Sequence, residues 1–338
     1  MNSKKNVMQI VNEESYDVVV VGGGPVGLYA GFRSALLLLR TRIVDKGRKW
    51  SRGFHVPLYH NLPTRPEGMT GKDLIRQLRK SLVLHKDYVS INDFVTIETI
   101  TRREDLFELR GINHLTKNER TYTSRVVVLA TGVVDRQPLI GGELKSILPY
   151  ANNRLFCYCV LCSGFQVPGK DAAVIGNGKT VLLTALDLLS FNATKVTVLT
   201  HGKALLKNGT ETKETIALKK RLTSKGVDVV TDEILSLFGI ENHKFGVRLV
   251  SGEEMIFDIA FSAMGFHKIN NDLAVMLGGT IDDTGYVVID DDSRVLATND
   301  QPIPGLYAIG DVTTNWNQLM TGFGDADKAI IHAWANYL

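Results

Sequence analysis

The chain has 338 residues, of which 44% are hydrophobic, and a formal net charge of +3 from 39 basic and 36 acidic residues. This length and composition predict a globular protein with a substantial core and about two domains. The charge is nearly balanced and shows no basic tract, which excludes a protein that tracks a nucleic-acid backbone. The weak basic bias is compatible with an acidic protein partner.

The cysteines and the N-terminal residues indicate the cellular compartment in which the protein works. Residues 1–15 carry two lysines but no apolar signal-peptide core, and we expect a short disordered tail. No stretch reaches the roughly 18 apolar residues of a membrane span. Three cysteines within six residues do not suit the disulfide framework of a small secreted fold. A cytoplasmic, reducing setting with redox-active thiols is the prediction.

The first motif in the chain is a dinucleotide-binding fingerprint. A β-branched run at 16–21 breaks at the glycines of GGGPVG, and residues 26–39 continue with a helical apolar period. The first glycine allows a tight turn, the third a close approach of a pyrophosphate, and the last close packing of helix on strand. The site residues that this fingerprint predicts are Gly22, Gly24, Pro25 and Gly27.

An acidic residue completes this first site. A second strand, 41–44, ends at Asp45, which lies 23 residues after Gly22. This is close to the spacing at which a carboxylate accepts hydrogen bonds from a ribose hydroxyl. Strand, helix and terminal acid agree, so we favour a nucleotide site over a plain glycine turn.

Two later segments indicate which dinucleotide binds. Ala130-Thr131-Gly132 closes an apolar strand at 126–129, and Gly310-Asp311 closes another at 306–309. With these segments the chain resembles the low-molecular-weight thioredoxin reductase family, over nearly its whole length. The resemblance implies FAD at the first site, with Thr131 and Gly132 beside the first nucleotide and Gly310 and Asp311 at the ribityl chain.

One flavin contact of that family differs here. The family has an Arg-Gln pair where this chain has Asn317-Gln318, followed by Gly322-Phe323-Gly324 at the start of the last helix. We expect Asn317 and Gln318 to contact the flavin, and the helix N-terminus to stabilise negative charge on its reduced form. The family's arginine is missing.

A cysteine pair, Cys159 and Cys162, precedes the second glycine loop. A CxxC at a helix start holds two sulfurs close enough to bridge and lowers a thiol pKa. Such a pair is also half of a zinc site, but the histidines and Cys157 supply no second pair of ligands, so no metal is predicted. The resemblance implies that Cys162 contacts the flavin and Cys159 exchanges with substrate. We expect Cys157 to be a buried bystander.

The proton donor of the family is absent. Its members have an aspartate directly after the second cysteine, where this chain has Ser163. A hydroxyl is too weak an acid to manage thiol protons near neutral pH. His55 and His60, in the loop after the first βαβ unit, are the candidates to replace it, although lone histidines are more often structural.

The second glycine loop, Gly176-Asn177-Gly178-Lys179, follows a strand at 172–175. We expect Gly176, Gly178 and Lys179 to bind a dinucleotide, whereas a P-loop is excluded because residue 173 is alanine. NADPH-dependent members carry an arginine cluster after the next strand, where this chain has Thr200-His201-Gly202-Lys203. NADPH is therefore disfavoured, and no acid replaces the cluster to favour NADH.

Three interpretations of this second site remain open. In the first, the second domain is a structural relic and ferredoxin supplies the electrons. In the second, this domain binds another dinucleotide. In the third, electrons flow in the reverse direction, from a dithiol to the flavin, as in dithiol oxidases of the family, and oxygen reoxidises the flavin. We favour the second, because the chain resembles the mostly cyanobacterial diflavin-linked relatives that hold a second FAD there. Two FAD per chain is then the expected count.

The predicted fold class is α/β, with two Rossmann-like nucleotide-binding domains. The FAD-binding domain is discontinuous, comprising 1–143 and 272–338, and the second domain, 144–271, carries the CxxC; glycines at 141–142 and 265 mark the crossings. The predicted function is FAD-dependent disulfide oxidoreductase, acting on a thioredoxin-like protein or a small disulfide or dithiol. By resemblance a homodimer is expected. A non-catalytic flavoprotein is the alternative of another class.

Overall fold

The computed structural model describes residues 14–203, 205, 212–313 and 316–338, so the predicted N-terminal tail lies almost wholly outside it. The chain forms two compact units. Unit 1 contains the described residues of Met1–His55, Gly71–Val133 and Ile269–Leu338, and unit 2 contains Val56–Thr70 and Val134–Lys268. Unit 1 is thus discontinuous in sequence, and unit 2 includes a short segment, Val56–Thr70, from within the first predicted domain.

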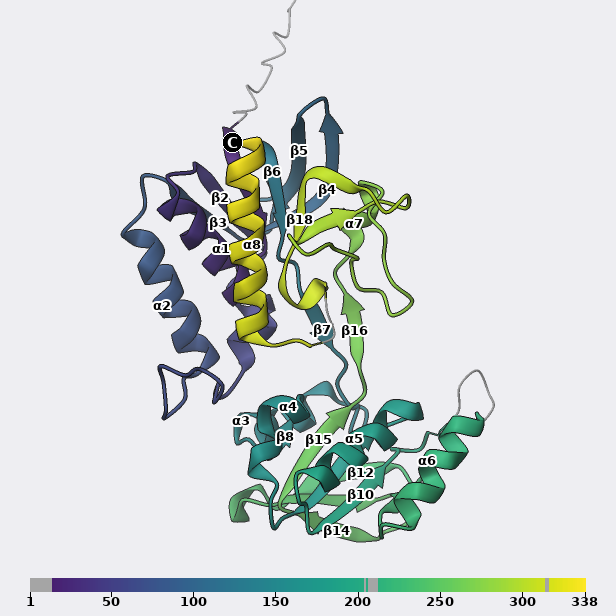
Figure 1. The fold of residues 1–338 in the computed structure, drawn as a ribbon. Helices are drawn as coiled ribbons and strands as arrows, with labels where there is room; N and C mark the ends of the chain where they lie inside the picture. The colour runs from purple at the N-terminus through teal and green to yellow at the C-terminus, as the bar shows by residue number, and fades with distance from the viewer. Residues whose placement is uncertain (1–13, 204, 206–211, 314–315) are drawn as a thin grey trace, which may run out of the picture. The chain divides into compact units, whose positions relative to one another are not determined.

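Unit 1 is built on an eight-stranded sheet (Figure 1). Its main path runs in the order β17-β18-β6-β1-β2-β3, and β5 joins β4 to β6. The strands are β1 (Glu14–Val21), β2 (Thr41–Asp45), β3 (Val89–Asp93), β4 (Val95–Arg103), β5 (Leu106–Asn113), β6 (Glu119–Leu129), β17 (Arg294–Leu296) and β18 (Pro302–Ala308). The helices are α1 (Pro25–Leu36), α2 (Gly71–Val83), α7 (Asp272–Met276) and α8 (Leu319–Tyr337).

The sheet of unit 1 is covered on both faces. Val18 and Val20 of β1 face α1, α2 and α8, whereas Val19 and Val21 face β4, β5 and α7. A strand buried on both faces has a continuous apolar run, which is what the valine-rich β1 shows. The result is a layered α/β unit around a parallel core of β18, β6, β1, β2 and β3.

Unit 2 has a parallel five-stranded sheet in the order β11-β10-β9-β15-β8, with a three-stranded antiparallel sheet, β12-β13-β14, beside it. One face of the parallel sheet packs on α5 and α6, and the other on the antiparallel sheet and α3. The strands are β8 (Phe156–Cys157), β9 (Asp171–Gly176), β10 (Lys195–Leu199), β11 (Asp228–Val230), β12 (Ile234–Phe238), β13 (Phe245–Leu249), β14 (Glu254–Phe257) and β15 (Ile259–Ala263). The helices are α3 (Leu148–Asn152), α4 (Val160–Ser163), α5 (Gly178–Ser190) and α6 (Lys213–Thr223).

The chain passes between the units four times, at 55/56, 70/71, 133/134 and 268/269. The last two crossings fall in β7 (Val133–Asp135) and β16 (Phe266–Ile269), and these two strands pair with each other. Gly265, just before β16, has a φ of +70°, a conformation that favours glycine. The predicted α/β class with two Rossmann-like parts is confirmed by these sheets.

Candidate active site

The strand ends of unit 1 meet at one edge of its sheet. Val21 is aligned with Val44 of β2 and with Leu129 of β6, and Leu129 is aligned with Ala308 of β18. The residues that follow these strands therefore lie at a common carboxyl edge, where open α/β sheets bind nucleotides. The predicted first site is brought together from four separate segments in this way.

The first glycine loop tolerates no side chain at its turn. A Cβ on Gly22 would lie 2.3 Å from the carbonyl oxygen of Ala130, and Gly22 has a φ of +117°. A Cβ on Gly27 would lie 1.9 Å from the carbonyl oxygen of Gly22. Both glycines are thus required by close backbone approach, as the fingerprint predicts.

The helix that follows the loop presents free amide groups. Gly24 is the N-cap of α1, Pro25 lies in its first turn, and no side chain caps the helix. No acidic residue lies in the first turn. An uncapped helix N-terminus attracts anions through its N–H groups and its dipole, which fits a pyrophosphate.

Asp45 lies against this loop. Its Oδ1 accepts a hydrogen bond from the amide of Gly23 at 3.1 Å, and its Oδ2 lies 3.4 Å from Nη2 of Arg79. Arg79 also donates two hydrogen bonds to Asp93, at 2.9 and 2.6 Å. Burial raises the pKa of Asp45, against the lowering effect of the Gly23 and Gly47 amides. The carboxyl group is thus fixed beside the first glycine loop.

The segment after β6 is fixed by Asn270, a residue that no sequence motif predicted. Thr131 donates its hydroxyl hydrogen to the carbonyl of Asn270 at 2.6 Å, and the Asn270 amide donates to the carbonyls of Thr131 and Gly132 at 2.9 and 3.1 Å. The Thr131 hydroxyl therefore holds the backbone of the site. No local pattern marks Asn270, because its role depends on a segment 139 residues away.

A second residue that the motifs missed, Arg52, lies at the predicted ribityl position. Its Nη1 is 3.0 Å from Oδ2 of Asp311 and donates to Oδ1 of Asn317 at 3.3 Å. Gln318 is the N-cap of α8 and makes no side-chain cap, so this helix also begins with uncapped amides. The two uncapped helices, the glycine loop and Asp45 together fit a flavin dinucleotide in unit 1.

Cys159 and Cys162 form a disulfide in unit 2, with a sulfur–sulfur distance of 2.02 Å. Cys159 is the N-cap of α4, and its Sγ accepts a hydrogen bond from the amide of Cys162 at 3.0 Å. A backbone N–H directed at this sulfur stabilises a thiolate once the disulfide is reduced. The position of the pair at a helix start is as predicted.

The third cysteine is separate from the pair. Cys157 is the last residue of β8 and is buried. Burial raises the pKa of its thiol to about 11, against a lowering hydrogen bond from Ser163. A thiol in this state is inert at neutral pH, which agrees with the expected bystander.

The two candidate histidines have different surroundings. His55 is exposed, and its Nε2 lies 2.8 Å from the carbonyl oxygen of Lys49. His60 packs edge to face on Phe165, with ring centroids 5.0 Å apart, and its buried Nε2 has no hydrogen-bond partner among the described residues. Burial, with the charge of Arg154, lowers the pKa of His60. Phe165 is three residues beyond Cys162, so only His60 packs on the segment that follows the redox pair.

The second glycine loop lies at the same sheet edge of unit 2 as the disulfide, because Val174 and Cys157 are both aligned with Phe261 of β15. A Cβ on Gly176 would lie 2.5 Å from the carbonyl oxygen of Ala263, and Gly178 has a φ of +65°. The turn itself requires both glycines, so their presence alone does not imply a bound ligand.

Two polar side chains of this second site, Lys179 and His201, have partners within unit 2. Lys179 forms an exposed ion pair with Glu214, at 2.6 Å. The Nδ1 of His201 accepts a hydrogen bond from the amide of Ile234, and its Nε2 lies 3.0 Å from the carbonyl oxygen of Leu139. Nδ1 is thus the acceptor of this ring, and Nε2 is the nitrogen placed to donate. His201 therefore bonds to the backbone at Leu139 and Ile234, and neither ring nitrogen is left to bind a phosphate.

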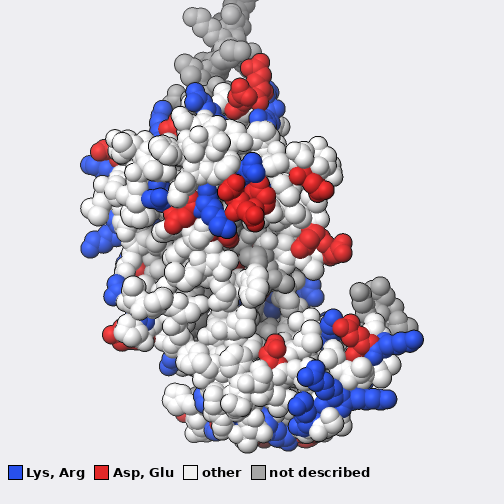
Figure 2. All heavy atoms as spheres, in the orientation of Figure 1, with Lys and Arg blue, Asp and Glu red and all other residues white. Residues whose placement is uncertain are grey.

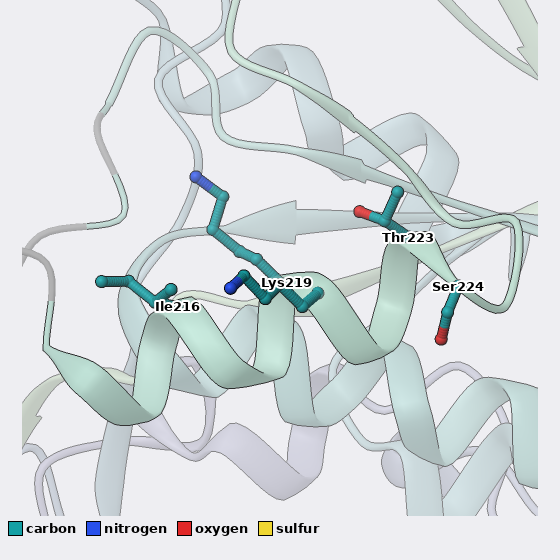
Figure 3. Close-up of a pocket in the computed structure, with 5 residues that line it drawn as sticks. Ile216, Lys219, Thr223 and Ser224 are labelled. Atoms are coloured by element: carbon teal, nitrogen blue, oxygen red, sulfur yellow. The ribbon is translucent and has the colours of Figure 1, made fainter.

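Charge and shape do not indicate a different site. Figure 2 shows Lys and Arg gathered at the α6 end of unit 2, where α6 contributes Lys213, Lys219, Lys220 and Arg221. A hollow of about 540 Å³ lies along the same helix (Figure 3), lined by Ile216, Lys219, Lys220, Thr223 and Ser224. All of these residues come from one helix face, without a glycine loop or a thiol, so we assign the hollow no catalytic role.

The described part of the chain offers neither a metal cluster nor a membrane span. No group of three or more His, Cys, Asp or Glu residues there is placed to hold a metal ion. None of the described helices is both long and apolar enough to cross a membrane.

Two Rossmann-like units, one with a flavin-type cradle and one with a redox disulfide at its sheet edge, define a flavin-linked disulfide oxidoreductase. Residues 16–333 match the family described as pyridine nucleotide-disulphide oxidoreductase. The chain belongs to this family. It is therefore a flavin-dependent disulfide oxidoreductase of thioredoxin reductase type, and membership implies FAD binding.

Individual relatives agree with this assignment. Thioredoxin reductase of Treponema pallidum is 26% identical over 332 residues, covering 96% of this chain and 98% of the relative. One alkyl hydroperoxide reductase component of Staphylococcus aureus is 28% identical over 340 residues, 99% of this chain, and the chain spans 61% of that relative's length. Thioredoxin reductase from Streptococcus pyogenes has the same fold, with a TM-score of 0.77 at 22% identity, over 95% of this chain and 97% of that one.

Proposed function

We propose that electrons pass between FAD in unit 1 and the Cys159–Cys162 disulfide in unit 2. The observation that carries this proposal is the disulfide at the start of α4, where the Cys162 amide supports the Cys159 sulfur at 3.0 Å. Bound FAD supplies a two-electron couple. Gly22, Gly24 and Gly27 would leave room for it, Asp45 and Asp311 would accept hydrogen bonds from its ribose and ribityl hydroxyls, and the amides at the start of α8 would be available to the ring.

Thiol exchange then transfers the electrons onward. Two electrons and two protons convert the disulfide into two thiols. The thiolate of Cys159 attacks a substrate disulfide and forms a mixed disulfide, and the substrate's first thiol leaves with a proton. Cys162 attacks the mixed disulfide, restores Cys159–Cys162 and releases the second substrate thiol. A thioredoxin-like protein is the proposed partner, since the Treponema pallidum relative is a thioredoxin reductase; a small disulfide or dithiol is the alternative.

The assignment of Cys162 as the flavin-facing thiol has a direct test. Anaerobic dithiothreitol should bleach the flavin absorbance of the wild-type protein and of Cys157→Ser to the same extent. Cys162→Ser should keep its FAD and lose the bleaching. Equal bleaching in Cys162→Ser would contradict the assignment, and no bleaching in any form would favour a non-catalytic flavoprotein.

For unit 2 we propose a dinucleotide other than NADPH, namely a second FAD, held by Gly176, Gly178 and Lys179. In support, α5 begins at an uncapped N-terminus with no acidic residue in its first turn. The exposed Lys179–Glu214 pair is weak enough for a phosphate to displace it, because exposed ion pairs contribute about 0–1 kcal/mol. Against NADPH, His201 is bonded to the backbone through both ring nitrogens.

The cofactor count decides between the interpretations of unit 2. The protein is denatured, and the released FAD is counted per chain. Two FAD support the diflavin form, and Gly178→Val should then lower the count to one. One FAD contradicts it and leaves three alternatives: ferredoxin as electron donor, NAD(P)H as electron donor, or oxygen as electron acceptor. Anaerobic titrations with reduced ferredoxin and with NAD(P)H, together with aerobic turnover, distinguish them. Size measurement in solution tests the proposed homodimer.

A further inference from the structure

Arg52 brings a cation to the flavin side of unit 1 from a segment that the fingerprints do not include. It lies in the 3-10 turn Arg52–His55, and its guanidinium reaches Asp311 and Asn317, which are 259 and 265 residues away in sequence. The Arg52 and Asp311 side chains are 21% and 27% exposed. The contact is thus partly shielded from solvent, where charge is less screened than at an open surface.

The chain at Arg52 also runs along the glycine loop. A Cβ built on Gly24 would lie 3.2 Å from Oγ of Ser51, so the segment before Arg52 passes next to the N-terminus of α1. Arg52 therefore lies between the phosphate end of the cradle and the start of α8. This location is next to the path of a dinucleotide that would extend from Gly24 toward Gln318.

We propose that Arg52 is a flavin-contacting cation, which binds at the ribityl and pyrimidine end of FAD and stabilises negative charge there. The inference rests on the proposed function, since it requires FAD in unit 1. A guanidinium has five N–H donors in a planar fork, which suits it to contact several acceptors at once, Asp311 and Asn317 among them. Asn317 also forms a hydrogen bond with Tyr286, which adds to the support of this end of the site.

A purely structural ion pair is the competing explanation, and it predicts different results. Loss of such a pair changes the stability of the protein and leaves the chemistry of the flavin unaltered. Loss of a flavin-contacting cation destabilises the anionic forms of the flavin, whether or not the stability of the protein changes. Sulfite is a suitable probe, because its lone pair adds to N5 of oxidised flavin and leaves the negative charge over the pyrimidine ring.

The experiment compares Arg52→Gln with Arg48→Gln in the full-length holoprotein. Arg48 is an exposed arginine four residues earlier and loses the same charge. We expect Arg52→Gln to weaken sulfite binding about tenfold or more, the size of one lost charge-assisted contact, with Arg48→Gln unchanged. A tenfold loss of preference for reduced FAD corresponds to a midpoint potential about 30 mV lower.

A measurement on the wild-type chain covers the case in which Arg52→Gln fails to fold. Phenylglyoxal modification is followed by mass spectrometry with and without FAD, and we expect FAD to protect Arg52 and not Arg48. Equal modification with and without FAD, or equal sulfite affinity in the two variants, overturns the inference alone. A wild-type protein that binds no FAD overturns the proposed function as well.

Discussion

The side chain of Ser163 forms a hydrogen bond with the thiol of Cys157, the cysteine outside the redox pair. Ser163 directly follows Cys162, at the position where the thioredoxin reductase family has an aspartate to manage thiol protons. Its hydroxyl instead supports a buried thiol at the end of β8. Proton transfer at the redox pair therefore requires another group, and Cys157 is kept out of the exchange.

Burial of Cys157 predicts a selective pattern of alkylation. With a thiol pKa of about 11, roughly one part in a thousand is thiolate at pH 8, and the sulfur is shielded as well. After reduction, iodoacetamide should modify Cys159 and Cys162 in the folded protein and reach Cys157 only after denaturation. Peptide mass spectrometry reads the sites, and rapid labelling of Cys157 in the folded protein would refute its isolation.

The same raised pKa predicts a pH dependence of stability. Between the ordinary thiol pKa near 9 and the folded value of about 11, the unfolded state loses its proton first, so the free energy of unfolding falls as pH rises. The two-unit difference corresponds to about 2–3 kcal/mol. Urea unfolding of wild type and Cys157→Ala between pH 8 and 11 measures it. Parallel curves for the two proteins would show that the thiol contributes no such linkage.

The glycine loop of unit 1 predicts a large difference between two substitutions in one helix. A Cβ on Gly27 meets the rigid carbonyl of Gly22 at 1.9 Å, whereas a Cβ on Gly31 meets the movable Cδ1 of Ile43 at 2.4 Å. Gly27→Ala should lower the free energy of unfolding by about 3 kcal/mol and abolish FAD binding, and Gly31→Ala should cost about 1 kcal/mol. Denaturant unfolding and FAD titration check both. Equal effects of the two substitutions would show that the backbone at Gly22 moves to make room for the new side chain, and would contradict this prediction.

His201 predicts poor discrimination between pyridine nucleotides. Both ring nitrogens are bonded to the backbone, so this position supplies no ligand for a 2′-phosphate. Since neither nucleotide has a dedicated charged contact in unit 2, we expect NADPH and NADH both to reduce the flavin slowly under anaerobic conditions, at rates that differ by less than about tenfold, the effect of one lost charged contact. A strong preference for NADPH in stopped-flow reduction would contradict this interpretation of unit 2.

His60 is our candidate to replace the missing proton donor, and His55 serves as its matched control. Burial lowers the pKa of His60, which favours the neutral imidazole, the form that accepts a thiol proton. His60→Gln should slow disulfide exchange by about a hundredfold, the lower range for a lost general base, and flatten its pH profile, with FAD reduction unchanged. His55→Gln should change neither. The same loss in both variants would remove His60 from this role.

The sequence was sufficient for the fold class and for residues that act through local geometry. Gly27 is required by its approach to Gly22 within the same loop, and Cys159 and Cys162 are three residues apart at the start of one short helix. Their pairing and positions were predicted from the sequence. The roles assigned to them toward FAD and substrate remain predictions.

Arg52, Asn270 and the bonding of His201 were not predictable in the same way. Each acts on partners far away in the sequence, so no short pattern marks it. The second glycine loop shows a related limit of sequence patterns. Gly176 is required because β9 and β15 approach closely, which is a property of the folded sheet and says little about a ligand.

The most direct test of electron transfer between flavin and disulfide is an anaerobic count of electrons. Wild-type holoprotein and the Cys159→Ser/Cys162→Ser double variant are titrated with dithionite, and flavin absorbance is followed to completion. We predict that the wild type takes up two more electrons per chain than the double variant, whether each chain holds one FAD or two. An equal uptake by the two proteins would show that the disulfide does not exchange electrons with the flavin, and would contradict the account.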